Sequence, residues 1–136
     1  MGLKIGIDIN DVIRDFSNNF LRVYKGYYDQ STEMTEDDIN SLNYFECFDF
    51  EDNDDYINFR YSEYVFELYG NAKVVDIKLP VKFNEWVSKT LTELDVSEDP
   101  EIVLFSPFEQ GASIQATLGF LSKNLIRVRE YYFPID

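Results

Sequence analysis

The sequence predicts an α/β fold in a single domain, with a short parallel sheet at its centre. Two continuous apolar runs, Leu3–Ile9 and Ile102–Phe105, each have the length of a strand that is buried on both faces, as in a parallel sheet. Each run is followed by a polar turn and then by helical spacing, which is the order of a strand–helix–strand unit. A chain of 136 residues, 45% of them hydrophobic, fills one sizeable core but not two.

The first strand and the helix after it open this unit. The strand leads into a polar turn at residues 8–11, and because its run is apolar throughout, we expect it to be a central strand. From residue 12 onward, apolar side chains recur every three or four positions, which predicts one buried face of a helix. The members of this face are Val12, Phe16, Phe20, Val23, Tyr24 and Tyr27.

The next segment is strongly acidic. No basic residue occurs between Lys25 and Arg60, whereas Asp and Glu accumulate there. The aspartates between residues 49 and 55 do not have the spacing of an EF-hand calcium loop. We therefore interpret the segment as a solvated acidic loop or a partner-facing surface. Its interleaved aromatic residues, which need to be covered, are Tyr44, Phe45, Phe48 and Phe50.

Two further helices are predicted before the second strand. Residues 59–69 carry apolar side chains at helical spacing, and Gly70-Asn71 is a favoured C-terminal stop. Another helix begins at Pro80, because proline is tolerated in a first helical turn. We expect both helices to build the core. The apolar face of the second helix consists of Phe83, Trp86, Val87, Leu91 and Leu94.

Three elements complete the predicted fold. The second strand, Ile102–Phe105, is stopped by Ser106-Pro107. Helical spacing through Ile114, Leu118 and Leu121 predicts a helix over residues 110–123. Residues 125–128 are mostly apolar and are predicted to form the third strand.

The composition excludes several classes of function. The chain has 26 Asp and Glu, 12 Lys and Arg and no His, which gives a formal net charge of -14. Such a charge repels a nucleic-acid backbone and an anionic membrane, so neither is an expected partner. Without His there is no Ser–His or Cys–His pair and no imidazole ligand for zinc. Cys47 has no second cysteine for a disulfide, and no signal peptide is recognised, so we expect a cytoplasmic protein.

Two polar residues are candidates for chemistry because they follow the two apolar strands. In an open parallel sheet, ligands bind beyond the carboxyl ends of the strands, where Asp8 and Ser106 are predicted to lie. A carboxylate there can attack phosphorus, and a neighbouring hydroxyl can hydrogen-bond the phosphoryl oxygens. An acidic residue after a strand is also a common helix cap or turn former, so both interpretations stand.

The order of these motifs resembles that of haloacid dehalogenase-like (HAD) phosphatases. The string Ile5–Val12 is similar to the family's first motif, an apolar strand that ends in Asp-x-Asp-Gly-Thr/Val. The string Ile102–Ser106 resembles its second motif, an apolar strand that ends in Ser or Thr. The resemblance implies a Rossmann-like HAD parallel sheet, with a core at residues 1–28 and 98–136. It also implies a helical cap insertion at about residues 29–97, similar to the small cap of the 5'-nucleotidase members.

The resemblance assigns roles to individual residues. Asp8 matches the nucleophile and magnesium ligand, and Ser106 matches the phosphate-binding hydroxyl. Asn10 stands at the position of the general acid/base carboxylate, which also gives its backbone carbonyl to the magnesium. An amide cannot exchange a proton with the leaving oxygen, and losing general acid/base help lowers a rate by about a hundred- to ten-thousand-fold. Lys123 matches the phosphate-neutralising lysine, although a lysine in the last turn of a helix also complements the helix dipole.

The family's final motif, an acidic pair on a fourth strand, has no counterpart, because we expect the sequence to end before such a strand forms. With three strands where the family has at least five, the sheet would be incomplete and one edge of a central strand would be exposed. Two explanations are open: the chain is a fragment of a longer enzyme, or it is a shortened relative. For the shortened relative, we expect a protein partner or self-association to complete the sheet.

These observations leave two functions open. The first is a catalytically degenerate HAD-like domain that acts as a protein-interaction or assembly module, for which a phage particle is one setting. The second is a magnesium-dependent phosphatase of the 5'-nucleotidase type, which forms an aspartyl-phosphate at Asp8. Mg²⁺ is an expected cofactor only for the second function. The aromatic residues considered for contact with its substrate are Tyr44, Tyr61, Tyr64 and Trp86.

Overall fold

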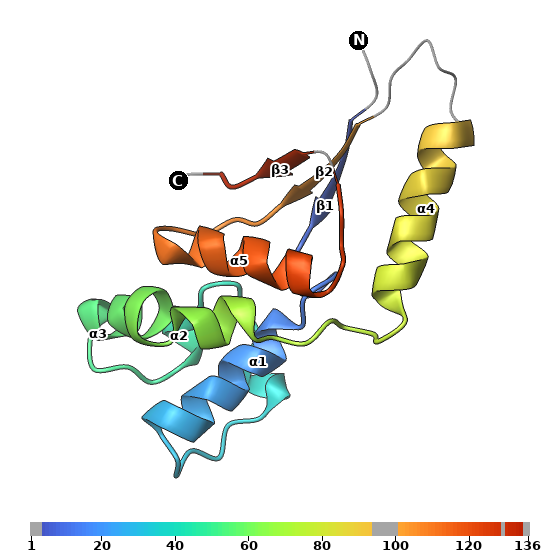
Figure 1. The fold of residues 1–136 in the computed structure, drawn as a ribbon. Helices are drawn as coiled ribbons and strands as arrows, with labels where there is room; N and C mark the ends of the chain where they lie inside the picture. The colour runs from blue at the N-terminus through green and yellow to red at the C-terminus, as the bar shows by residue number, and fades with distance from the viewer. Residues whose placement is uncertain (1–3, 94–100, 129, 135–136) are drawn as a thin grey trace.

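The sheet is parallel and has three strands (Figure 1). The computed structural model describes residues 4–93, 101–128 and 130–134. The strands are β1 (Lys4–Asp8), β2 (Glu101–Phe105) and β3 (Glu130–Tyr132), in the order β1-β2-β3. Asp8 pairs with Phe105, so Asp8 and Ser106 reach the same edge of the sheet. The mixed α/β fold and the parallel sheet predicted from the sequence are confirmed.

Helical segments fill the connections between the strands. Those between β1 and β2 are α1 (Phe16–Val23), η1 (Tyr24–Tyr28), η2 (Glu36–Asp38), α2 (Tyr44–Cys47), α3 (Asn53–Asn58), η3 (Phe59–Glu63), η4 (Phe66–Gly70) and α4 (Leu79–Glu93). The connection from β2 to β3 contains α5 (Ala112–Lys123). In Figure 1, α1, α2 and α3 gather beyond the carboxyl end of β1, whereas α4 stands at one side. No helix in the described part of the chain has both the length and the apolar character that crossing a membrane requires.

The larger of two hydrophobic clusters is aromatic and joins α1 to the helical segments of residues 44–70. Rings pack closely in it, for example Phe20 and Phe48, whose centroids are 4.7 Å apart. Such tilted ring pairs add stabilisation beyond the burial of apolar area. The acidic segment is therefore not a loop alone: Tyr44, Phe48 and Phe50 enter this cluster, and most of its carboxylates stay exposed. Phe45 lies outside the cluster and is 36% exposed, so the prediction that it is covered is wrong. The members with almost no exposure are Phe16, Phe20, Val23, Tyr24, Phe59, Leu68 and Tyr69.

The second hydrophobic cluster lies between the sheet and α5. Leu104 of β2 packs there with Phe120 and Leu121 of α5, and the other buried members are Ile9, Ile13, Ala72 and Ile126. The predicted helix over residues 110–123 is confirmed within two residues at its start. Its buried face differs in part from the predicted one: Leu121 is buried as predicted, but Leu118 is exposed, and the other buried residues are Ser113, Ala116, Thr117 and Phe120.

The position of β1 differs from the prediction. We expected a central strand buried on both faces, but in the described residues β1 pairs only with β2 and its side chains are half-buried or exposed. Ile7 packs against the cluster under the sheet, whereas Gly6 on the other face is exposed. An apolar run shows that a strand has an apolar face, but which strands flank it depends on contacts distant in the sequence.

Other boundaries also differ from the predictions. Helix α1 begins at Phe16 rather than at residue 12, because residues 9–15 form a turn, and Val12 is 50% exposed. The helical region predicted for residues 59–69 begins earlier, at Asn53, and ends at Gly70 as expected. Residues 125–128 are not a strand: Ile126 is buried as part of the turn after α5, and the strand is Glu130–Tyr132.

Helix α4 is not the core-building element that we predicted. Only its first turns contact the cluster under the sheet, through the partly buried Leu79 and Phe83. Trp86, on the predicted apolar face, is 41% exposed. Leu94 lies outside the described residues, as does the side chain of Leu91. The helix is tied to the segment after α5 by Asn84, whose Nδ2 donates to the carbonyl of Leu125 at 2.6 Å.

Candidate functional site at the ends of β1 and β2

The turn after β1 is held by its own polar groups. The backbone N–H of Asn10 donates to Oδ1 of Asp8 at 2.9 Å. Asp11 has a positive φ of 60°, a conformation that Asp tolerates better than most residues. Its Oδ1 accepts hydrogen bonds from the backbone N–H groups of Phe16 at 3.0 Å and Ser17 at 2.9 Å, so it caps the start of α1. Asp11 is thus a structural cap, and Asp8 is left at the end of the strand.

Asn10 does not point freely into solvent, because its side chain is bound by Arg14. The Nε and Nη2 atoms of Arg14 both donate to Asn10 Oδ1, at 3.1 and 2.6 Å. This fixes the oxygen of the amide toward the guanidinium and directs Nδ2 toward Ser106, whose Oγ lies 3.4 Å away. The predicted residues Asn10 and Ser106 are therefore brought together, but in a closed network in which Arg14 Nη2 also donates to Ser106 Oγ at 3.5 Å.

Arg14 is fully buried, and its other hydrogen bonds go to elements distant in the sequence. Its Nη1 donates to the carbonyl of Tyr69 at 2.9 Å and to Thr117 Oγ1 at 2.7 Å. Its Nη2 lies 3.8 Å from Oε2 of Glu109, which is also buried. Burial lowers the pKa of Arg14 to about 10, while Glu109 opposes this change, so the guanidinium remains charged at neutral pH.

Glu109 balances this buried charge imperfectly. Its Oε1 accepts a hydrogen bond from Thr117 at 2.6 Å, but Oε2 is buried and has no hydrogen-bond partner among the described residues. Burial raises the pKa of the Glu109 carboxyl, although Arg14 and the nearby hydroxyls of Ser106, Thr117 and Ser113 act in the opposite direction. Arg14 and Glu109 thus form a buried ion pair, and this pair anchors the hydrogen-bonded network of Asn10, Arg14 and Ser106 at the ends of β1 and β2.

A small pocket of about 110 Å³ opens beside this network at the carboxyl edge of the sheet. Asp8 lines it, and burial raises the pKa of its carboxyl, although the Asn10 N–H bond lowers it. Ser106 does not line the pocket and is fully buried. The lining residues are Asp8, Asn10, Asp11, Phe16, Leu42, Tyr44, Arg60, Pro107 and Phe108.

Arg60 gives this pocket a positive charge. It is only 4% exposed, with Nε donating to the Tyr69 hydroxyl at 2.7 Å and Nη1 to the Tyr56 hydroxyl at 2.6 Å. Its Nη2 has no hydrogen bond to any residue that the structure describes. Burial lowers the pKa of Arg60, but Tyr69, Tyr61 and Tyr56 more than offset this, so the group stays charged. The pocket therefore holds a guanidinium as well as the carboxylate of Asp8.

No protein-family model, curated protein or solved structure matches this chain. The function must therefore be argued from the fold and from this site.

Lys123 is not part of the pocket. It is exposed in the last turn of α5 and does not line the space beside Asp8. The physical reason is the direction of α5, which begins after β2 and returns toward the start of β3, as a connection between parallel strands must. The cations near the strand ends are instead Arg14 and Arg60, which the sequence analysis missed as site residues.

Two sequence signals point to these arginines. Arg14 follows Asn10 by four positions in an otherwise acidic turn, and Arg60 is the only basic residue between Lys25 and Lys73. Neither signal says that the side chain is buried. The aromatic residues considered for substrate contact are also divided by the structure: Tyr44 lines the pocket, whereas Tyr61, Tyr64 and Trp86 do not.

The residues at this edge are a poor set of ligands for Mg²⁺. Mg²⁺ requires near-octahedral oxygen ligands and is usually held by carboxylates. Asp8 and the backbone carbonyl of Asn10 are the predicted ligands, but Asp11 is engaged in capping α1, and the guanidinium of Arg14 lies against Asn10. No group of three Asp, Glu, Cys or His suited to a metal occurs among the described residues. We therefore derive no catalytic step through Mg²⁺.

Proposed function

We propose that this chain is a catalytically inactive HAD-like domain that acts as a protein-interaction or assembly module. The observation that carries the proposal is the closed network of Asn10, Arg14 and Ser106. The residue at the acid/base position is an amide, and its oxygen is already occupied by two hydrogen bonds from Arg14. The hydroxyl that would bind phosphate is fully buried behind it. Neither group is available to a phosphate ester in the pocket.

The same network explains why such a site would persist as structure. Arg14 joins the turn after β1 to η4 through the carbonyl of Tyr69 and to α5 through Thr117. A buried charge held by several hydrogen bonds fixes the relative positions of the elements that contact it. In this proposal, residues resembling a phosphatase motif hold together the sheet edge and the helices around it.

The alternative is a magnesium-dependent phosphatase of the 5'-nucleotidase type. The observation that favours it is the pocket itself, which places the half-buried carboxylate of Asp8 near the guanidinium of Arg60. A phosphoryl group is stabilised by such a cation. Against the alternative stand the poor ligand set for Mg²⁺ and the amide at position 10.

A phosphatase assay separates the two proposals. The purified chain, Asp8→Asn and Asn10→Asp would be incubated with nucleoside monophosphates or p-nitrophenyl phosphate, with and without Mg²⁺, and released phosphate would be measured. We expect no release by the unsubstituted chain above that of Asp8→Asn. We also expect no gain in Asn10→Asp, because Ser106 stays buried. Magnesium-dependent release that Asp8→Asn abolishes, with an unchanged circular dichroism spectrum, would establish the phosphatase instead.

A further inference from the structure

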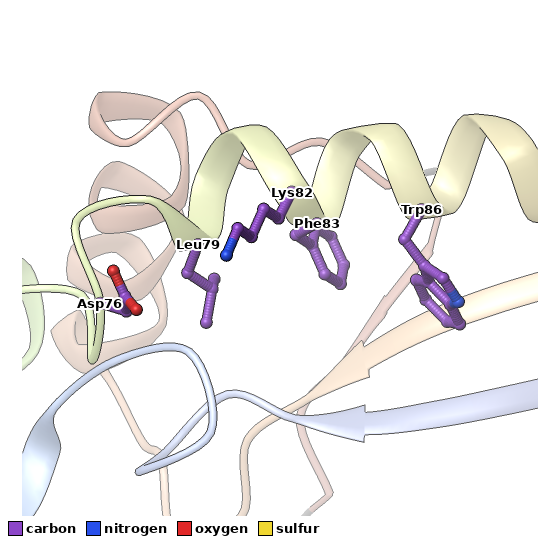
Figure 2. A pocket seen from close by; sticks show the side chains of 5 residues that line it. All are labelled: Asp76, Leu79, Lys82, Phe83 and Trp86. Carbon is purple, nitrogen blue, oxygen red and sulfur yellow. The ribbon is translucent and has the colours of Figure 1, made fainter.

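Helix α4 carries an apolar groove that is open to solvent. Figure 2 shows Leu79, Phe83 and Trp86 projecting from α4 on the side where the strands run. Together with Asp76 and Lys82 they line a groove of about 320 Å³. Leu79 and Phe83 are partly buried against the cluster under the sheet, whereas Trp86 is 41% exposed. The groove is therefore held to the fold at one end, and its Trp86 end is left uncovered by the described part of the chain.

Lysines run along this groove. The N–H of Lys82 donates to the carbonyl of Lys78 at 3.2 Å, so Lys78 continues the helical turn at the start of α4. Residues four positions apart lie in one line along a helix, so Lys78, Lys82 and Trp86 form one row beside the row of Leu79 and Phe83. We call these five residues the α4 surface. It combines exposed lysines with apolar side chains.

The charge of this region differs from that of the rest of the chain. Residues 73–89 contain four lysines and two acidic residues, whereas the whole chain has 26 acidic and 12 basic residues. Lys78 and Lys82 are exposed and form no ion pair with a described residue. Asp76, one of the two acidic residues, is engaged in the turn, where its Oδ1 accepts from the backbone N–H of Lys78 at 2.9 Å. The α4 surface is therefore a positive region on a strongly negative protein.

A surface of complementary chemistry lies on α2 and α3. The ring centroids of Phe45 in α2 and Tyr56 in α3 are 5.6 Å apart, so the two helices are adjacent there. Phe45 and Ile57 are exposed apolar residues. Asp54 precedes Ile57 by three positions and shares its helix face, and Glu46 follows Phe45. The carboxylates of Glu46 and Asp54 are exposed and form no ion pair with a described residue. We call Phe45, Glu46, Asp54 and Ile57 the α2–α3 surface.

The two surfaces lie on opposite sides of the molecule. In Figure 1, α4 stands at one side of the sheet, and α2 and α3 lie at the other. They cannot meet within one chain, but they can meet between two copies. The acidic segment of residues 29–67 holds half of the chain's 26 acidic residues and one basic residue, so it attracts the lysines of α4 more than any other part of the chain does.

We propose that the α4 surface of one copy of this chain binds the α2–α3 surface of a second copy. Trp86 packs among the exposed apolar side chains of the second copy, while Lys78 and Lys82 face its carboxylates. Because the contact joins two different surfaces, further copies add head to tail and form a ring or an open chain. The proposal rests on the proposed function as an assembly module and names its partner.

The first test is the mass of the full chain in solution, measured by sedimentation over a wide range of concentrations. We expect oligomers that grow with concentration and weaken with salt, because the Debye length falls from about 30 Å at 0.01 M to about 8 Å at 0.15 M. Lys82→Glu should raise the dissociation constant by about ten-fold or more, since an attraction becomes a repulsion. Lys25→Glu makes the same change of net charge on η1, outside both surfaces, and should leave the constant unchanged.

Two variants that each lose one surface test whether the contact is head to tail. Trp86→Asp removes the apolar anchor of the α4 surface, and Phe45→Asp removes that of the α2–α3 surface, so each variant alone should be monomeric. An equimolar mixture should form a dimer with one copy of each, because each variant keeps the surface that the other lacks. This dimer should not grow, since both of its remaining surfaces carry an introduced aspartate. Leu118→Asp, at a similarly exposed residue of α5, is the matched control and should associate like the unsubstituted chain.

Three outcomes would overturn the proposal. They are a monomer at every concentration at low salt, an oligomer that neither aspartate variant weakens, and a mixture of the two monomeric variants that stays monomeric. If an aspartate variant loses its circular dichroism spectrum, Lys82→Glu and Glu46→Lys replace the pair, and their mixture should associate more tightly than either alone. None of these substitutions changes Asp8, Asn10 or Ser106, so the phosphatase assay is decided separately and the two proposals fail separately.

Discussion

Replacing Arg14 by Met should destabilise the protein by about 3–5 kcal/mol at neutral pH, the cost of breaking a buried ion pair by removing one partner. The side chain of Arg14 is fully buried, and methionine fills much of its volume without a charge. The loss is therefore mainly electrostatic. The carboxylate of Glu109 stays in the interior, where its Oε2 already lacks a hydrogen-bond partner among the described residues, and the amide of Asn10 loses two donors.

The pH dependence of this loss follows from the pKa of Glu109. Burial already raises that pKa while Arg14 opposes the change, so removing Arg14 raises it further. A carboxyl whose pKa is higher in the folded than in the unfolded state stabilises the folded state through its protonated form. This stabilisation is complete below the pKa of the unfolded state and is lost as the pH rises through the pKa of the folded state. The raised pKa of Glu109 in the unsubstituted chain makes both chains lose stability equally just above the ordinary value of 4.5. Above that raised pKa, the destabilisation should grow by about 1.4 kcal/mol per pH unit while Glu109 stays protonated in the folded variant.

Urea unfolding followed by circular dichroism measures both effects. Arg14→Met and the double variant Arg14→Met/Glu109→Gln would be compared with the unsubstituted chain at mildly acidic and mildly alkaline pH. The double variant should recover part of the stability, and more at the higher pH, because it removes the buried carboxylate. A single variant within about 1 kcal/mol of the unsubstituted chain, or a double variant no more stable than the single one at either pH, would refute the reasoning.

Two further predictions concern the aromatic cluster. Arg60→Lys should lower the free energy of unfolding by about 1–3 kcal/mol, because an ammonium does not reproduce the fork that binds the hydroxyls of Tyr69 and Tyr56; unchanged urea unfolding would contradict this. Burial raises the pKa of Tyr44 to about 12, although its hydrogen bond with Ser17 acts in the opposite direction, so the stabilisation that the neutral phenol gives is complete below pH 10 and is lost as pH rises through 12. The difference in tyrosinate absorbance between the chain and Tyr44→Phe should therefore titrate near 12, and a titration near 10 would show that the phenol is solvated.

The parallel sheet was predictable because its signals are local. Each of the first two strands is a short apolar run followed by a polar turn, and the helices between them give the length that a parallel connection requires. The third strand was misplaced by a few residues. The apolar side chain of Ile126 fits the pattern of a strand, but in the structure it packs in the cluster between α5 and the sheet.

The candidate site was predictable only in part. Asp8 and Ser106 follow from their places at strand ends, because parallel strands end at one edge of a sheet, whereas Asn10 was selected only by the resemblance. Arg14 was missed, since a charged residue in a polar turn ordinarily faces water. Only the packing of η4 and α5 around the turn gives its guanidinium the partners that make its burial tolerable.

By itself, the sequence determined the strand–helix alternation, the parallel sheet and the polar residues at its carboxyl edge, because these depend on patterns within a few residues. The tertiary structure decided three other properties. Among the described residues, it placed β1 at an edge of the sheet, closed the network of Asn10, Arg14 and Ser106, and left Lys123 outside the lining of the pocket. Each of these properties depends on which elements, distant in the sequence, pack together. Their packing depends on the shape and charge of surfaces that form only when the chain folds.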